Sequence, residues 1–302
     1  MAYDPQLKPE DKKSLFGVII HSFFVVPFLI AVFSILLFAA VRVLTMEKRS
    51  VYDYLQDVKE GGSTKRWQGA FNLLRVISEN KRWQGAYDLS RVVADQGSVP
   101  VDDKFVDEMD AAFAASKHDD DRVRQYLALA MARSGNQKFV DALLADIAEE
   151  KDENLYAIIT ALGILKNNKA TDALLKYMDD PNPRIRLAAV IALGNIGDAN
   201  AVSPLKHMLS DNEPNVVWDS AIALAKMGDR SGKDIIMKLL DREYLKGFPN
   251  VGAQQQSRIM QVAILASAKW KDPEVDTVLQ KLFESDKNMN VRVFARQVLE
   301  LK

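Results

Sequence analysis

The stretch NPRIRLAAVIALGNIGDANAVSPLKHMLSD, from Asn182 to Asp211, decides the fold. Its apolar residues recur three and four positions apart, which is the spacing of helices with one buried face. Gly197 predicts the end of the first helix, and Asp198 predicts the cap of the next. Pro183 stands in the first turn of the first helix, where proline is tolerated. The buried face of the first helix is predicted to comprise Ile185, Ala189, Ala192, Leu193 and Ile196, and that of the second Ala201, Val202, Leu205 and Leu209.

This helical pair repeats along the chain every 31 residues, a spacing that we call the repeat interval. It separates the motifs Ala130-Met131-Ala132, Ala161-Leu162-Gly163, Ala192-Leu193-Gly194 and Ala223-Leu224-Ala225. After Asp241 the register resumes only beyond about twelve extra residues (DREYLKGFPNVG), with Ala266 in the place of Ala192. Because one pair cannot bury both of its faces, the pairs are expected to stack into a solenoid.

The repeat resembles the HEAT repeat family, in particular the short HEAT-like repeats first noted in phycobilisome lyases. The residues that carry the resemblance are IRLAAVIALGNIGD (Ile185 to Asp198), with echoes at Val216–Asp229 and Val291–Leu299. The resemblance covers residues 119–302 well and residues 65–93 more loosely. It implies an all-α superhelix of antiparallel helix pairs, without a β-sheet, from about Val51 to Lys302. HEAT-like relatives include enzymes and binding proteins, so the fold alone does not specify a function.

The residues before the repeats predict a membrane anchor. Ser14 to Val41 is a run of 28 residues without Asp, Glu, Lys or Arg, and a spanning helix needs about 20 apolar residues. A cleaved signal peptide is the alternative, but its apolar region spans only about 7–15 residues and ends in a small-residue cleavage site. The flanks carry three Lys on one side and four Lys or Arg on the other, which favours a cytoplasmic C-terminal domain.

Two near-copies follow, KRWQGAFNLLRVI (Lys65–Ile77) and KRWQGAYDLSRVV (Lys81–Val93), identical at nine of thirteen positions. They predict two short antiparallel helices, with Asn80 capping the second. Each Trp either anchors a ligand or fills a seam between helices, and we favour the seam. The predicted organisation is a polar tail (1–13), a transmembrane anchor (14–44), a juxtamembrane helix and linker (45–62), N-terminal helical repeats (63–117) and a HEAT-like domain (118–302).

Composition argues against several functions. With 40 Lys and Arg against 41 Asp and Glu, the net charge is −1, whereas nucleic-acid binding needs a surplus of cations. The chain has no Cys, and its three His are far apart, so neither a metal site, a cofactor nor a catalytic residue is predicted. The resemblance to a di-iron hydroxylase would require His-Glu pairs, which the sequence lacks. Acidic clusters such as Asp119-Asp120-Asp121 are expected to cap helices.

We therefore predict a non-enzymatic, membrane-anchored scaffold that docks a protein partner, expected to be a membrane protein complex, at the inner membrane. The HEAT-like arrangement implies that one set of helices lines a concave face, and residues four apart form one stripe on each helix. The predicted partner-binding residues are Tyr156, Leu187, Ile191, Trp218 and Ile222, with Arg184 and Lys226 as a polar rim. The insertion around Tyr244–Phe248 is predicted to add a second contact.

Three alternatives remain open at this point. The stripe residues could pack between successive helices and never reach solvent. The chain could be a permanent accessory subunit of a membrane transporter or protease complex. Finally, the resemblance leaves a lyase-type enzyme related to phycobilisome lyases as a further alternative.

Overall fold

A computed structural model describes residues 71–95, 102–118 and 120–301, together with Phe28 and Val32. Every element in these ranges is an α-helix or a short 3-10 helix, and none is a strand; the all-α prediction is confirmed for them. The chain divides into two compact units after Ser50, and the description below concerns the second. Over the part of the chain that is described, no helix has the length and apolar content to cross a bilayer. The predicted anchor, apart from Phe28 and Val32, and the juxtamembrane segment lie outside these ranges.

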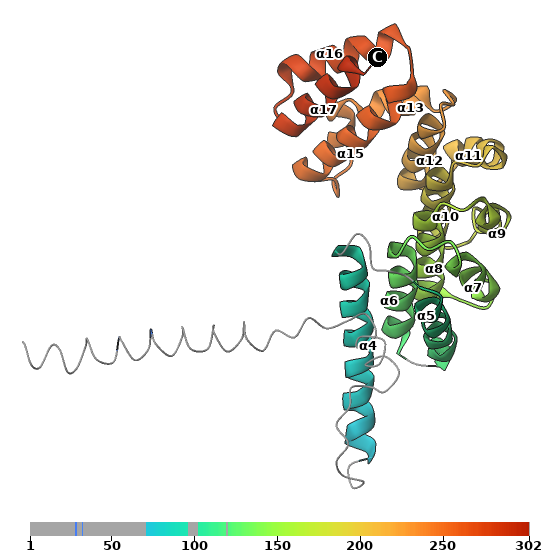
Figure 1. Cartoon of the computed structure of the whole chain (residues 1–302). Coiled ribbons are helices and arrows are strands. Elements are labelled where there is room, and N and C mark those ends of the chain that lie inside the picture. The colour runs from blue at the N-terminus through green and yellow to red at the C-terminus, as the bar shows by residue number, and fades with distance from the viewer. Residues whose placement is uncertain (1–27, 29–31, 33–70, 96–101, 119, 302) are drawn as a thin grey trace, which may run out of the picture. The chain divides into compact units, whose positions relative to one another are not determined.

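Long helices stack side by side in one row, which we call the first row (Figure 1). Each member contacts the next along the chain. The first row consists of α4 (Phe71–Asp95), α6 (Asp121–Arg133), α8 (Asp152–Leu165), α10 (Pro183–Ile196), α12 (Pro214–Lys226), α15 (Ala253–Ala266) and α17 (Met289–Glu300).

The connecting helices form a second row, and α7, α9, α11 and α13 are shorter than their first-row neighbours. The second row consists of α5 (Asp103–Ala115), α7 (Phe139–Asp146), α9 (Thr171–Leu175), α11 (Val202–His207), α13 (Lys233–Leu239) and α16 (Pro273–Ser285). The short elements between them are the 3-10 helices η2 (Ser116–His118), η3 (Asn168–Ala170), η4 (Ala199–Ala201), η5 (Met208–Ser210) and η6 (Ser267–Lys269), and the helix α14 (Arg242–Lys246) in the insertion.

The prediction of two short antiparallel helices around the near-copies is wrong. Residues 71–95 form one continuous helix, α4, and Asn80 lies inside it rather than at a cap. The residues Ser78, Glu79 and Asn80 include neither glycine nor proline, so nothing in the backbone ends the helix there. Packing of α4 against α6 stabilises the helix.

The turn chemistry of the central repeat is as predicted. The Asn182 side chain accepts a hydrogen bond from the amide of Arg184 at 3.0 Å and caps α10. Gly197 ends α10 in the left-handed region at φ 76°, a conformation that glycine adopts without steric cost. Asp198 then accepts a hydrogen bond from the amide of Asn200 at 2.9 Å. The predicted core positions Ile185, Ala189, Ala192 and Leu193, together with Ala201 and Leu205, are all buried, whereas Ile196, Val202 and Leu209 are half-buried.

Glycine and alanine face each other where first-row helices meet. A Cβ atom on Gly163 of α8 would lie 2.7 Å from the Cα and Cβ atoms of Ala192 in α10. One repeat interval later, a Cβ atom on Gly194 of α10 would lie 2.5 Å from the Cβ atom of Ala223 in α12. These distances leave no room for a side chain on either glycine, so the spacing of three successive repeats depends on two missing methyl groups.

The buried side chains form two clusters that meet at α12. The first extends from Ala86 to Leu224, and the second from Trp218 to Val298. Helix α12 contributes to both, because Val216 and Leu224 belong to the first cluster while Ala221 belongs to the second. This helix is therefore the joint between the regular repeats and the part of the chain that follows the insertion.

Gly194→Ala is expected to lower the free energy of unfolding by about 2 kcal/mol, because the added methyl group overlaps Ala223. In an unobstructed helix the same substitution would be stabilising by about 1 kcal/mol. A decrease in the free energy of unfolding would therefore indicate the overlap with Ala223. Denaturant unfolding of the full chain in detergent, followed by circular dichroism, measures the change.

The matched control is Gly252→Ala. Gly252 precedes α15, its φ is negative, and an added Cβ atom has nothing within 4 Å. We expect its effect to stay below about 1 kcal/mol. If Gly194→Ala were as stable as the original chain, the close packing of α10 against α12 would be incorrect.

Candidate partner-binding face

Three predicted residues, Tyr156, Leu187 and Ile191, lie with Ile164 on one face of α8 and α10. Ile164 and Ile191 are 40% and 41% exposed, and Tyr156 and Leu187 are half-buried. Residues spaced by four lie on one side of a helix, and the two helices pack against each other. We call Tyr156, Ile164, Leu187 and Ile191 the docking stripe. Two of its members, Ile164 and Ile191, expose a large part of their apolar side chains to solvent.

Arg184 borders this stripe at the amino ends of its helices, as predicted for a polar rim. Its guanidinium carbon lies 4.2 Å from the centroid of the Tyr156 ring, and its guanidinium also forms an ion pair with Glu153 of α8. Both contacts run from α10 to α8. Because the cation covers the ring and faces a carboxylate, Arg184 fixes Tyr156 while its own charge is largely matched.

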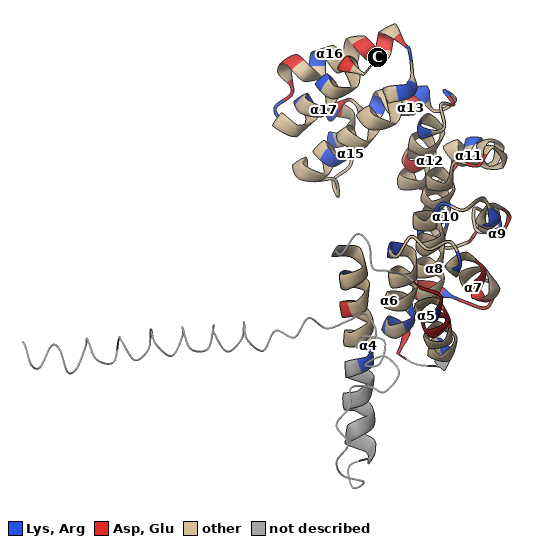
Figure 2. Ribbon diagram, viewed as in Figure 1, with Lys and Arg blue, Asp and Glu red and all other residues tan. Residues whose placement is uncertain are grey.

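The opposite border is formed by cations that face oxygens of the backbone or of an amide. Lys226 is exposed and donates to Asn195 Oδ1 at 3.5 Å, and Lys269 donates to the carbonyl oxygen of Lys226 at 2.7 Å. Lys166 ends α8 and is exposed. Lys166, Lys226 and Lys269 form no ion pair with any carboxylate of the described residues, whereas acidic residues gather on α5 and α7 of the second row (Figure 2).

Trp218 and Ile222 were predicted as exposed partner-binding residues, but they are only 5% and 6% exposed. The insertion lies against Trp218, with the ring centroid of Phe248 at 4.6 Å and that of Tyr244 at 6.4 Å. Trp218 Nε1 also donates to the Tyr244 hydroxyl at 3.4 Å. Trp218 and Ile222 on α12 therefore pack within the fold, which is the alternative that the sequence left open. Sequence periodicity did not reveal this, because no other repeat contains the insertion.

Aromatic residues also gather on α4 and α6. Trp83 stacks on Tyr126 with ring centroids 6.4 Å apart, and the guanidinium of Arg122 lies 4.6 Å from the Trp83 ring centroid. The second KRW motif therefore places its Trp in a seam between helices, as we favoured; Trp67 of the first lies outside the described residues. Tyr87, which is 38% exposed, meets Tyr126 edge to face at 5.2 Å.

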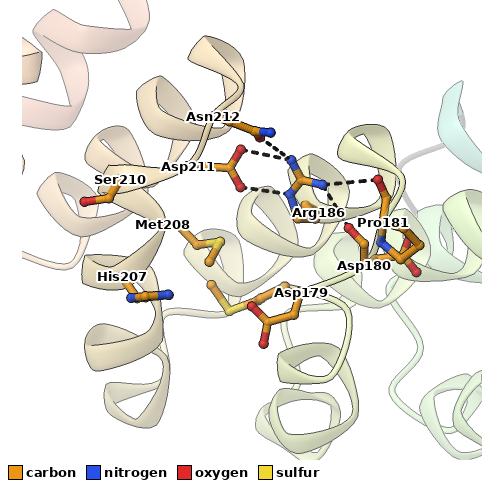
Figure 3. Close-up of a pocket in the computed structure, with 10 residues that line it drawn as sticks. Asp179, Asp180, Pro181, Arg186, His207, Met208, Ser210, Asp211 and Asn212 are labelled. Atoms are coloured by element: carbon orange, nitrogen blue, oxygen red, sulfur yellow. Dashed lines mark hydrogen bonds and ion pairs between the residues drawn. The ribbon is translucent and has the colours of Figure 1, made fainter.

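A polar cleft of about 330 Å³ lies where the 3-10 helix η5 leads into α12 (Figure 3). Arg186 crosses it and donates to both carboxylate oxygens of Asp211, at 2.8 and 3.0 Å. It also donates to Asn212 Oδ1 and to the carbonyl oxygen of Asp180, each at 2.9 Å. The bidentate pair holds the pKa of Asp211 below its usual value. His207 lies at the edge of the cleft and is exposed.

The same arrangement recurs two repeat intervals earlier, at Arg124. This side chain is 1% exposed; it pairs with Asp146 and Glu150 and donates to the carbonyl oxygen of Phe113 at 2.8 Å. These arginines therefore join successive repeats, since each contacts the turn of a neighbouring pair. Sequence analysis missed them, although their equivalent positions in two repeats could have revealed them. Within the described ranges, no group of three or more His, Asp or Glu residues could hold a metal ion.

One carboxylate on α12 has an unusual pKa. Burial raises the pKa of Asp219 on α12 from 3.8 to about 6, and the positive charge of Lys226 opposes the rise only partly. Asp219 is half-buried and directly follows the buried Trp218. Because burial disfavours the charged form, the ionised carboxylate destabilises the fold.

Asp219→Asn is expected to raise the free energy of unfolding by about 2–3 kcal/mol at pH 8 and by little at pH 4. The folded-state pKa of Asp219 is raised, so stability falls as pH increases from about 4 through 6 in the original chain, and the amide removes this loss. Denaturant unfolding at a series of pH values measures the difference.

Asp211→Asn is the matched control with the opposite sign. Its folded-state pKa is lowered by Arg186, so its stabilisation is present above the ordinary pKa and disappears as pH falls. We expect Asp211→Asn to destabilise the chain at pH 8. A pH-independent effect of Asp219→Asn would contradict the assignment of a raised pKa.

Comparisons with known proteins agree with this repeat architecture. The HEAT repeat family matches residues 109–184 and 171–245. A search of curated proteins finds no match. Among solved structures, the complex of CpcE and CpcF of phycocyanin lyase from Nostoc sp. PCC7120 is similar with a TM-score of 0.52, at 16% identity over 85% of this chain and 96% of that chain. An engineered protein is similar at 18% identity over 82% of this chain and 96% of that one, with a TM-score of 0.40.

The matched segments contain α6 to α13, which include the docking stripe, the glycine contacts and the polar cleft. The similarity to the phycocyanin lyase chain concerns the fold, because the identity is low. Residues 109–245 of this chain therefore match the HEAT repeat family, within an all-helical solenoid whose fold is similar to that of the phycocyanin lyase chain.

Proposed function

We propose that this chain is a non-enzymatic docking module, anchored in the inner membrane through residues 14–44, that binds one protein partner on α8 and α10. The partner belongs to a membrane protein complex, and the repeat domain lies on the cytoplasmic side. The observation that carries the proposal is the docking stripe, because the residues Ile164 and Ile191 are 40% and 41% exposed next to the half-buried Tyr156 and Leu187. Contiguous apolar surface on a folded protein is typical of an interaction site.

The surroundings of the stripe support a binding role. Large apolar residues in the middle of an interface supply most of the affinity, and polar residues border them. Arg184 stands at one border of the stripe and Lys226 at the other. The polar cleft is a weaker candidate, because Arg186 and Asp211 in that cleft satisfy each other. The fully buried Arg124 is likewise engaged within the fold.

Two alternatives have specific support. A permanent accessory subunit of a transporter or protease complex would use the same stripe, but its repeat domain would be unstable without the complex. A lyase-type enzyme is supported by the fold similarity to the phycocyanin lyase chain. Incubation with phycocyanin distinguishes it, because a lyase would change the visible absorption of that pigmented protein, whereas a docking module would not.

Ile191→Asp is expected to abolish partner capture while leaving the fold intact. A charge at the centre of an apolar interface is costly, whereas Ile191 is 41% exposed in the free chain, so the free energy of unfolding should change by less than about 1 kcal/mol. Full-length chains purified from gently solubilised membranes, with co-purifying proteins quantified by mass spectrometry, give the result.

Met289→Asp is the matched control, because Met289 is also an exposed apolar residue, at 62%, but lies on α17. It should retain every co-purifying protein. Equal losses for the two variants, or no co-purifying protein with the original chain, would refute the docking proposal.

Deleting residues 14–41 is expected to move the chain from the membrane fraction to the supernatant. The run is longer than the hydrocarbon core requires, so the original chain should stay in carbonate-washed membranes at full length. N-terminal sequencing of the membrane-bound chain is the decisive measurement. A mature N-terminus after residue 38 would mean that the run is a cleaved signal instead of an anchor.

A further inference from the structure

The insertion after α13 lies on the first row in the way that a bound peptide would. Helix α14 places Tyr244 at its third position, and Phe248 follows four residues later. Both rings pack edge to face on Trp218 of α12, with interplanar angles of 62° and 83°, and on each other at 5.3 Å. One short segment thus covers one register of the row with two aromatic side chains.

The register that this segment covers has two equivalents that remain open. Trp218 stands one repeat interval after Leu187, which itself stands one repeat interval after Tyr156. Ile222 is likewise the equivalent of Ile191. The two members of the α12 register are 5% and 6% exposed, whereas Ile191 is 41% exposed and Leu187 and Tyr156 are half-buried. The insertion therefore covers Trp218 on α12, whereas no insertion covers its equivalents Leu187 on α10 and Tyr156 on α8, which are half-buried.

The charges of the insertion are matched within the chain. Glu243 forms an ion pair with Lys246, Asp241 caps α14, and Arg242 pairs with Asp286. The insertion therefore meets Trp218 through its two aromatic side chains, and its likeness to a bound peptide concerns these apolar contacts.

We propose that the docking stripe binds a short helical segment of a partner protein that carries two large apolar side chains four residues apart. The inference rests on the proposed docking function and specifies the ligand. Its apolar side chains occupy, on Leu187 and Ile191, the places that Tyr244 and Phe248 occupy on Trp218. Residues four apart present one face of a helix, and an apolar helical face lying on such a surface is a common mode of peptide recognition.

A photo-crosslinking experiment with the chain's own sequence as the probe tests this. The probe is a synthetic peptide DREYLKGFPNVG, corresponding to residues 241–252, with a photo-reactive group at its amino end. It is irradiated with the full-length chain in detergent, and the crosslinked positions are mapped by mass spectrometry. We expect crosslinks on α8 and α10 that persist at high salt, because the proposed contacts are apolar and salt screens only charged ones.

Variants of the chain and of the probe sharpen the result. Ile191→Asp should reduce crosslinking about ten-fold. Met289→Asp, which also adds a carboxylate at an exposed apolar position, should leave it unchanged. A probe with Asp in place of its Tyr and Phe should not crosslink. Circular dichroism of each chain variant confirms that the repeats remain folded.

Four outcomes would overturn the proposal. Crosslinks confined to α12 would mean that the peptide only displaces the insertion. Equal crosslinking of Ile191→Asp and Met289→Asp would mean that the stripe is not the site. A second copy crosslinked through α10, or anionic lipid vesicles bound through Ile191, would identify a different occupant. If the chain docks another kind of segment, the peptide will not crosslink, but proteins will still co-purify with the chain. The proposed ligand and the proposed docking function can therefore be refuted independently.

Discussion

The close approach of α8, α10 and α12 depends on the absence of a side chain at two positions. Gly163 faces Ala192, and Gly194 faces Ala223 one repeat interval later, at distances that exclude a Cβ atom on either glycine. The side-chain contacts between neighbouring helices depend on this close approach. Arg184 reaches Tyr156 on the neighbouring helix, and Lys226 reaches Asn195, because the helices are near enough for single side chains to span them. The docking stripe is continuous for the same reason.

Much of the fold could be predicted from the sequence, because the same pattern of helix, turn and helix occurs several times along the chain. The glycine and aspartate at 197 and 198 acted as expected, since their turn is local and needs no tertiary context. The failure at α4 has the opposite cause. Near-identity at residues 65–77 and 81–93 suggested two units, but identical sequence can also continue in one helix when no residue ends it.

The candidate site was only partly predictable. Tyr156, Leu187 and Ile191 lie on the expected face, because a spacing of four residues determines the side of a helix. The burial of Trp218 and Ile222 depends on a segment without a counterpart elsewhere in the chain, so periodicity carried no information about it. The structural arginines were missed because a charged residue on a helix is usually solvated. Arg124 is buried because carboxylates and a carbonyl oxygen from neighbouring turns surround it.

The ion pairs that join the repeats also bear on how the chain acquires its structure during synthesis. Arg186 and Asp211 are 25 residues apart, Arg184 and Glu153 are 31 apart, and even the hydrogen bonds from Arg242 to Asp286 join residues only 44 apart. Short separations give a low contact order, which is typical of rapidly folding helical proteins. A repeat therefore has its partners available soon after it leaves the ribosome, and its apolar faces are exposed only briefly to other chains.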